Sequence, residues 1–308
     1  MSRRRHLFNS NRSQCGQDVC GDVHINSNDL QMCGRPSYPA TGVQRILGGS
    51  LAREGSFPWH VLVVTRVGGR AGGTLLGGGW VLTAAHTLYP KGAARPSVQR
   101  LRATTRVRTA GGGGGTGLRG LLAREGPGIE VIAVHPGFGE ELHDFDHDIA
   151  LIKLRPGGAG QGGQAEEMPA CMPGPGEGAL LFRPGRVGYV AGWGLADNYF
   201  LRDQLRYAPL PLVGQHACRQ SLRTARIGGR QPVVTDNMFC AGLPEGGRDA
   251  CGGDTGGGLL VPHPRSGDWH LLGIVSWGIG CGRPGRYGVY TRVSRYLHWI
   301  NEVMAAHP

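Results

Sequence analysis

Short apolar runs, each cut off by glycine or proline, set the strongest limit on how this chain can fold. They are WHVLVV (59–64), TLLGGGWVLTAAH (74–86), IEVIAVH (129–135), DIALIKL (148–154), RVGYVAGWG (186–194), LLGIVSWG (271–278) and YGVYTRV (287–293). Strand-length runs separated by turn residues are typical of an all-β sandwich or barrel. The chain has 56 glycines and 20 prolines among 308 residues, and this content favours turns and short strands over long helices. One helix is expected at the end, where Tyr296, Ile300 and Val303/Met304 follow helical spacing.

The segments outside these runs suggest how the chain is organised. Residues 1–45 are polar and contain three cysteines, so we interpret them as a linker or the remnant of an upstream module. The stretch TAGGGGGTGLRG (109–120) is expected to be a flexible surface loop. No apolar run is long enough to span a membrane, and no signal peptide is visible after the basic start MSRRRHLFNSNRSQ.

Charge and cysteine content narrow the classes of function. The formal net charge is +11, but the arginines look scattered, which favours a solvated surface over a nucleic-acid partner. The eight cysteines show no paired CxxC clusters, so we expect disulfides rather than zinc. Disulfides indicate an oxidising, extracellular compartment. A secreted protein is therefore expected, although the visible chain carries no leader.

The stretch ACGGDTGGGLLV (250–261) allows three chemical interpretations. Asp254-Thr255-Gly256 spells the motif of an aspartic protease, which needs a second carboxylate that only a second copy of the chain could supply. Gly253 to Gly257 fits a nucleophile elbow, but GGGLLVPHP after it is poor material for the helix that such an elbow requires. The third interpretation is a protease loop of another fold, with His, Asp and the nucleophile in that chain order.

The third interpretation matches the chain best. His86 ends LTAAH, Asp148 opens DIALIKL and Thr255 comes last. Together with RILGG, GSFPWHVLV, AGWG, NMFCAG, DACGGDTGGG, GIVSWG and YGVYTRV, these motifs make residues 46–308 resemble the trypsin/chymotrypsin family. The linker CGRPSYPATGVQRILGG, HTLYPK and SWGIGCG look most like the complement-initiating proteases, such as the mannan-binding-lectin-associated serine proteases. The resemblance implies two six-stranded antiparallel β-barrels with the active site between them.

The resemblance also implies a role for each residue of the site. His86 would be the general base and acid, Asp148 would orient it, and the backbone N–H groups of Gly253 and Thr255 would form the oxyanion hole. In HDFDHD (143–148) the neighbouring acids and His147 superficially suggest a metal site, and we expect a polar loop there instead. The matching specificity pocket, selective for Arg or Lys, consists of Asp249, Ser276, Gly278 and Gly288.

Activation and disulfides follow from the same resemblance. Cutting Arg45-Ile46 would free an ammonium group to pair with Asp254, so the chain would be a zymogen. The implied disulfides are Cys33–Cys171, Cys218–Cys240 and Cys251–Cys281, which leaves Cys15 and Cys20 to pair with each other or with an upstream module. No cofactor is expected, and the family's calcium loop, residues 99–121, holds no acidic residue here.

Thr255 is the main departure, because the family has serine at this position. A threonine hydroxyl can attack a carbonyl, but its extra methyl is stiff at χ1 and has to point somewhere. The family's disulfide near the nucleophile is replaced by Ala71 and Thr87, which we expect to leave room for the methyl. We therefore expect an attenuated nucleophile. Gly258, where the family has proline, is expected to loosen the loop slightly.

Two other functions stay open from the sequence. One is a catalytically inactive pseudoprotease that acts by binding, and the other is a module that binds anionic glycans through the +11 charge. As a protease, the chain would act on protein substrates with Arg or Lys at the cleaved bond. Complement components or serpin inhibitors are the partners that the resemblance implies.

Overall fold

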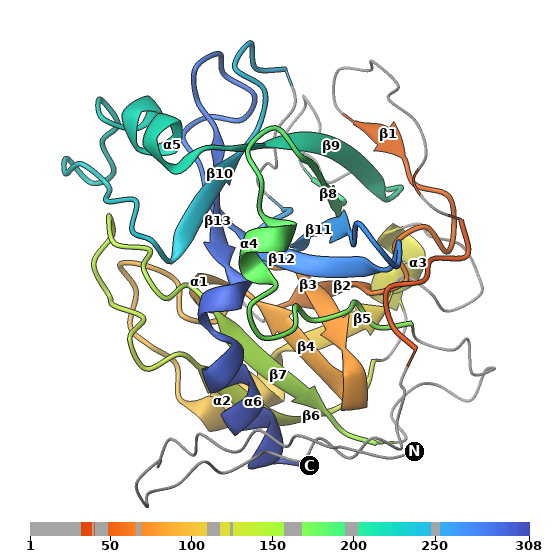
Figure 1. The fold of residues 1–308 in the computed structure, drawn as a ribbon. Coiled ribbons are helices and arrows are strands. Elements are labelled where there is room, and N and C mark those ends of the chain that lie inside the picture. The colour runs from red at the N-terminus through yellow and green to blue at the C-terminus, as the bar shows by residue number, and fades with distance from the viewer. Residues whose placement is uncertain are drawn as a thin grey trace, which may run out of the picture. The chain divides into compact units, whose positions relative to one another are not determined.

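The computed structural model describes residues 32–38, 40, 49–65, 69–109, 118–123, 126–156, 168–194, 203–247 and 253–308. Two antiparallel sheets account for most of this structure, and the strands β2–β7 and β8–β13 gather in two separate parts of the molecule (Figure 1). The expected all-β architecture is therefore present. None of the described helices is long and apolar enough to cross a membrane.

The first sheet has six strands in the order β5-β2-β3-β4-β7-β6. Its strands are β2 (His60–Val64), β3 (Arg70–Leu76), β4 (Trp80–Thr83), β5 (Arg106–Thr109), β6 (Ile129–Val134) and β7 (Ala150–Leu154). Alternate side chains of β2 and its neighbours fill the core, since Val61, Val63 and Val107 have no exposed surface. The sheet curls like a barrel, although no pairing of β5 with β6 occurs among the described residues.

The second sheet closes into a barrel because β8 pairs with β9 as well as with β11. Its order is β1-β9-β10-β13-β12-β11-β8, with the short β1 (Ser50–Leu51) added as a seventh strand beside β9. The others are β8 (Val187–Gly192), β9 (Arg206–Val213), β10 (Met238–Ala241), β11 (Gly258–Pro262), β12 (Trp269–Trp277) and β13 (Gly288–Arg292). The expected pair of six-stranded antiparallel units is present: β8–β13 form a closed barrel with β1 as an addition, and β2–β7 form a sheet that curls as a half-barrel.

The helices are short and lie at the ends of strands. They are α1 (Ala85–Leu88), α2 (Val98–Thr104), α3 (Leu118–Ala123), α4 (Gly178–Leu181), α5 (Gln215–Ser221) and α6 (Leu297–Ala305), with 3₁₀ turns η1 (Gly77–Gly79) and η2 (Val293–Arg295). The expected C-terminal helix is α6, and it buries Ile300. The loop expected over 109–120 is partly wrong, because Leu118 begins α3 and is buried in the core.

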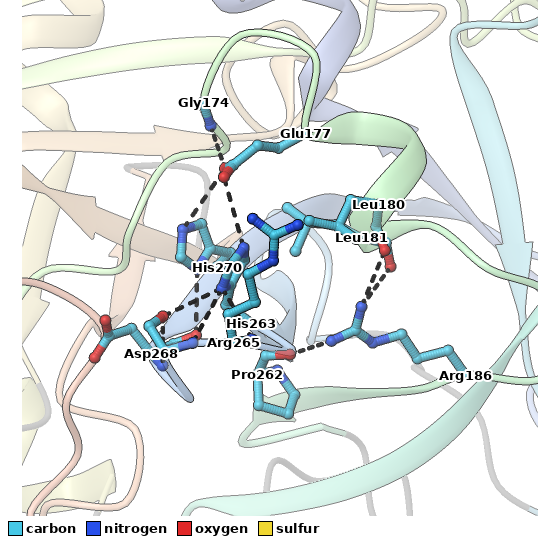
Figure 2. Close-up of polar contacts among 11 residues, drawn as sticks. Gly174, Glu177, Leu180, Leu181, Arg186, Pro262, His263, Arg265, Asp268 and His270 are labelled. Atoms are coloured by element: carbon cyan, nitrogen blue, oxygen red, sulfur yellow. Dashed lines mark hydrogen bonds and ion pairs between the residues drawn. The ribbon is translucent and has the colours of Figure 1, made fainter.

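A polar network fastens the segment after Cys171 to the hairpin of β11 and β12 (Figure 2). Glu177 accepts a hydrogen bond from the backbone N–H of Gly174 at 2.7 Å, and its two carboxylate oxygens face His263 Nε2 at 3.6 Å and His270 Nε2 at 4.0 Å. Arg186 donates to the carbonyl oxygen of Pro262 on the same hairpin. This network lies outside the site described below.

Residues 33–35 are attached to Cys171 and to the start of β12, next to the polar network just described. Cys33 forms a disulfide with Cys171. The Gly34 N–H donates to the Pro169 carbonyl oxygen at 2.7 Å, and the Trp269 N–H donates to the Gly34 carbonyl oxygen at 2.8 Å. Arg35 pairs with Asp268 at 3.0 Å. The segment is therefore attached by a covalent bond, by backbone pairing and by an ion pair.

Candidate active site

His86 and Asp148 meet at the ends of two neighbouring strands of the first sheet. His86 lies on α1, just after β4, and Asp148 lies just before β7, which pairs with β4. The Nδ1 of His86 is 2.7 Å from Asp148 Oδ2, and the His86 backbone N–H donates to Asp148 Oδ1 at 2.9 Å. A carboxylate that receives both bonds fixes the orientation of the imidazole and the position of its backbone.

Asp148 is fully buried and takes its remaining hydrogen bonds from the second barrel. The Ser276 hydroxyl donates to Asp148 Oδ2 at 2.5 Å, and the Thr291 hydroxyl donates to the Asp148 carbonyl oxygen at 2.9 Å. Burial alone would raise the pKa of the Asp148 carboxyl. The charge on His86 and the hydrogen bonds from His86 and Ser276 outweigh burial and hold that pKa below its ordinary value. The carboxylate is therefore ionised at neutral pH.

The loop that carries Thr255 is held between the two sheets. The N–H of Gly72 on β3 donates to the Thr255 carbonyl oxygen at 2.7 Å, and the N–H of Gly256 donates to the Val275 carbonyl oxygen at 2.8 Å. Gly253 and Gly256 have φ values of 97° and 84°, a region that side chains other than glycine rarely adopt. Among the described residues, neither the N–H of Gly253 nor that of Thr255 donates a hydrogen bond.

His86 and Thr255 line one cavity of about 370 Å³. Its other walls include three residues expected at the specificity pocket, Ser276, Gly278 and Gly288. We expected Ser276 only as a wall of the specificity pocket. In the structure its hydroxyl also donates a hydrogen bond to Asp148. No hydrogen bond joins the Thr255 hydroxyl to the His86 ring in the described part of the chain.

Two aromatic rings and a lysine complete the wall beside His86, and no motif in the sequence pointed to them. Phe145 contacts the edge of His86 with ring centroids 5.6 Å apart and stacks on Trp277 at 5.7 Å. The Lys91 ammonium donates to the carbonyl oxygens of Gly139 (2.6 Å) and Asp144, over the ring of Phe138. Burial lowers the pKa of Lys91. Lys91 therefore ties the segment after His86 to the segment before Asp148.

The HDFDHD stretch is a polar loop, as expected, and one of its acids has a structural role. Asp146 Oδ1 accepts hydrogen bonds from the side chains of Thr235 (2.9 Å) and Asn237 (3.0 Å), so it joins the loop to the second barrel. Within the described ranges, no three His, Cys, Asp or Glu side chains are arranged to hold a metal ion.

Asp254 and Gly258 flank the Thr255 loop. Asp254 Oδ1 accepts a hydrogen bond from the Gly194 N–H at 2.9 Å, so its carboxylate faces away from the loop toward the end of β8. A side chain at Gly258 would meet Thr74 Oγ1 at 2.5 Å and Leu271 Cδ1 at 2.7 Å. These neighbours leave no space for a side chain at this position, and the expectation that Gly258 loosens the loop stays a prediction.

Several predicted residues lie outside the described residues. They are Cys15 and Cys20, the activation pair Arg45 and Ile46, the pocket acid Asp249, and Cys251. Cys281 is disulfide-bonded, and its expected partner is Cys251. Besides Cys33–Cys171, the structure contains the expected disulfide Cys218–Cys240.

Comparison with known proteins agrees with this geometry. Residues 46–300 match the family described as Trypsin. The chain is 37% identical over 276 residues to mouse complement C1r-B subcomponent, covering 89% of this chain and 36% of that protein. It is 38% identical over 279 residues to human complement C1r subcomponent-like protein, covering 89% of this chain and 52% of that protein. The corresponding rat protein is 37% identical over 279 residues, covering 89% of this chain and 55% of that protein.

The chain thus spans about half or less of the length of these relatives. The family match covers both sheets, the His86–Asp148 pair and the Thr255 loop. On these grounds the chain belongs to the trypsin family of serine proteases and is related to the complement C1r proteases.

Proposed function

We propose that this chain is the zymogen of an endopeptidase that cuts protein substrates after Arg or Lys, with Thr255 as an attenuated nucleophile. The observation that carries the proposal is that Thr255 lines the same cavity as His86, whose ring is hydrogen-bonded to the buried Asp148 behind it. Asp148 is buried and ionised there, so it can stabilise a positive charge on the imidazole.

Each proton in the reaction has a route through His86. The bond to Asp148 leaves the Nδ1 of His86 as the donor, so Nε2 can accept the hydroxyl proton of Thr255 as the oxygen attacks the substrate carbonyl. The same proton then goes to the nitrogen of the leaving peptide. Water repeats the sequence on the acyl-enzyme and releases the product. The N–H groups of Gly253 and Thr255 would donate to the developing oxyanion.

Selection of Arg or Lys rests on Asp249 and on the glycines of the cavity. Gly278 and Gly288 have no side chains, which leaves space for a long basic group. A carboxylate at the closed end would otherwise be left without a partner, so it selects a cation. Activation rests on cutting Arg45-Ile46, after which the new ammonium group would pair with Asp254.

Attenuation follows from the extra methyl of Thr255. A nucleophile displaced by about an ångström can lose roughly 10² in rate, and complete loss of the nucleophile costs about 10⁶ in a related mechanism. We expect Thr255→Ser to raise kcat/KM by about 10² or less if threonine already works. Thr255→Ala should then abolish turnover.

The alternative is a pseudoprotease that binds partners without cutting them. The observation that favours it is the missing hydrogen bond between the Thr255 hydroxyl and His86 in the described structure. Catalytic hydrogen bonds are often long before substrate binds, so this observation does not decide between the two. A rise of several decades from an undetectable baseline in Thr255→Ser would favour the pseudoprotease.

The test uses the full chain cut at Arg45, assayed with an arginyl amide or thioester substrate. His86→Ala is the control for contaminating protease, because it removes the general base. Turnover that is equal in the wild type and in His86→Ala would overturn the enzyme proposal. Complement components as substrates and serpins as inhibitors are the partners to test next. We infer secretion from the disulfides and from the relatives.

A further inference from the structure

The net positive charge of the chain is concentrated in residues 55–124. Between Glu54 and Glu125 the sequence has no acidic residue, yet this segment has Arg66, Arg70, Lys91, Arg95, Arg100, Arg102, Arg106, Arg108, Arg119 and Arg124. The segment builds β2, β3, β4 and β5. Our expectation of scattered arginines is therefore wrong for this part of the chain, and a local positive field should attract acidic partners.

Two of these arginines lie in one row across the sheet. On β3, Arg70 pairs with Val64 of β2, and on β5, Arg106 pairs with the same Val64. Side chains in register on adjacent strands share a face, so Arg70 and Arg106 emerge together, about 10 Å apart at their backbones. Both are exposed, and neither forms an ion pair within the described residues. Arg106 uses only Nη1, which donates to the carbonyl oxygens of Ala103 and Thr105.

This row lies on the face that contacts the Thr255 loop. A side chain at Gly72 would meet Gly257 of that loop at 2.8 Å, and the Gly72 N–H donates to the Thr255 carbonyl oxygen. Arg70 is two residues before Gly72 on the same strand, so its side chain points to the same side, about 7 Å farther along. The residue between them, Ala71, points into the core and is buried.

The direction of a bound substrate follows from the cavity. The acyl side of the cleaved bond would lie along Ser276 and Trp277 at the end of β12 and Gly278 after it, since these residues line the cavity with Thr255. The leaving side would then extend from Thr255 in the other direction, over Gly72 toward Arg70 and Arg106. An extended peptide advances about 3.3 Å per residue, which brings its second to fourth residues after the cleaved bond within reach of the two guanidinium groups.

We propose that Arg70 and Arg106 form an acid-recognition surface that selects substrates with Asp or Glu at the second to fourth positions after the cleaved bond. This inference rests on the proposed function for the orientation of the substrate. The surface would act by charge on exposed side chains, so its effect should fall as ionic strength rises.

The test measures binding separately from turnover. Two fluorescein-labelled peptides share an acyl side that ends in Arg and carry a reduced, uncleavable bond after it. One has Glu and Asp at the second to fourth following positions, and the other has Lys there. Fluorescence anisotropy with the chain cut at Arg45 compares wild type, the double variant Arg70→Glu/Arg106→Glu, and Arg223→Glu. The last is an exposed arginine after α5 in the second barrel and controls for added negative charge.

We expect the wild type and Arg223→Glu to bind the acidic peptide roughly three- to tenfold more tightly at low salt, from about two exposed ion pairs. The double variant should lose or reverse this preference. Equal binding of the two peptides by the wild type, no binding of either, or an unchanged preference in the double variant would overturn the inference.

Hydrolysis of a small arginyl amide, which has no leaving-side residues, separates the two proposals. If the binding preference is present without turnover, the recognition surface stands and the enzyme proposal fails. If turnover is present without the binding preference, the enzyme proposal stands and the recognition surface fails.

Discussion

His60 provides a quantitative test of how the site is packed. It lies on β2 with only 3% of its surface exposed, and its ring packs on Trp193 with centroids 5.0 Å apart. Side chains built at Gly72 or Gly257 would meet its Cε1 at 3.2 and 3.3 Å. His60 Nε2 is buried, and no hydrogen-bond partner for it occurs in the part of the chain that the structure describes. The imidazole therefore fills the space behind the Thr255 loop and has to be neutral there.

The consequence is a loss of stability in acid. Burial lowers the pKa of His60 from 6.5 to about 4. Because the folded pKa lies below the unfolded one, the unfolded chain binds more protons between these values, and the free energy of unfolding falls as pH falls. At 1.36 kcal/mol per pKa unit, His60 removes about 1.4 kcal/mol by pH 5.5 and about 2.5 kcal/mol by pH 4.5, relative to pH 7.5.

The assay compares urea unfolding of the wild type with His60→Gln from pH 7.5 to 4.5, with the disulfides intact. Other groups titrate in this range in both proteins, so the difference between them isolates His60. His298→Gln, at a side chain 89% exposed on α6, controls for removing an imidazole as such. The wild type should lose about 2.5 kcal/mol relative to His60→Gln by pH 4.5. A difference that does not change with pH would refute the conclusion that His60 is buried and neutral.

Three further predictions concern the groups around the site. Ser276→Ala removes a hydrogen bond to a buried carboxylate and should lower the free energy of unfolding by about 1.5–3 kcal/mol. Measured by urea unfolding, a loss below about 0.5 kcal/mol would mean that the bond to Asp148 contributes little. Lys91→Met should speed amide hydrogen exchange in residues 139–146. Exchange in α6, after correction for any change in the global free energy of unfolding, should stay near its wild-type rate. Equal exchange at 139–146 in both proteins would mean that the hydrogen bonds from Lys91 do not hold this segment. Gly72→Ala places a carbon against the backbone of Gly257 and should cost about 1–3 kcal/mol of stability. An unchanged melting temperature would show that the loop yields easily.

The apolar runs between turn residues predict most of the strands, but they miss β5, β9, β10 and β11. β9 escapes prediction because Pro209 and Pro211 lie inside it. Its pairing with β8 and β10 is a tertiary effect that overrides the local signal. α3 escapes because the glycine run before it dominates the composition of the segment.

The site, like the fold, has residues that local sequence predicts and contacts that only the folded chain reveals. His86 and Asp148 are predictable because each has a distinctive local context. The bond from Ser276 to Asp148 spans 128 positions, and only the folded chain brings these residues together. The pairing of Arg70 and Arg106 through Val64 is equally hidden, because it depends on strand register and not on spacing along the chain. The geometry of the Thr255 hydroxyl depends on a single rotamer, which no sequence pattern encodes.

The attachment of residues 33–35 determines where a cut enzyme would work. With Cys33 bonded to Cys171 and Gly34 paired to Trp269, whatever precedes Cys33 stays with the catalytic unit after a break at Arg45. If the chain has the proposed activity and the part before Cys33 binds a surface, proteolysis would be confined to bonds near that surface. The distance from the attachment point to a peptide bond, more than free diffusion of the enzyme, would then decide which bonds are cut.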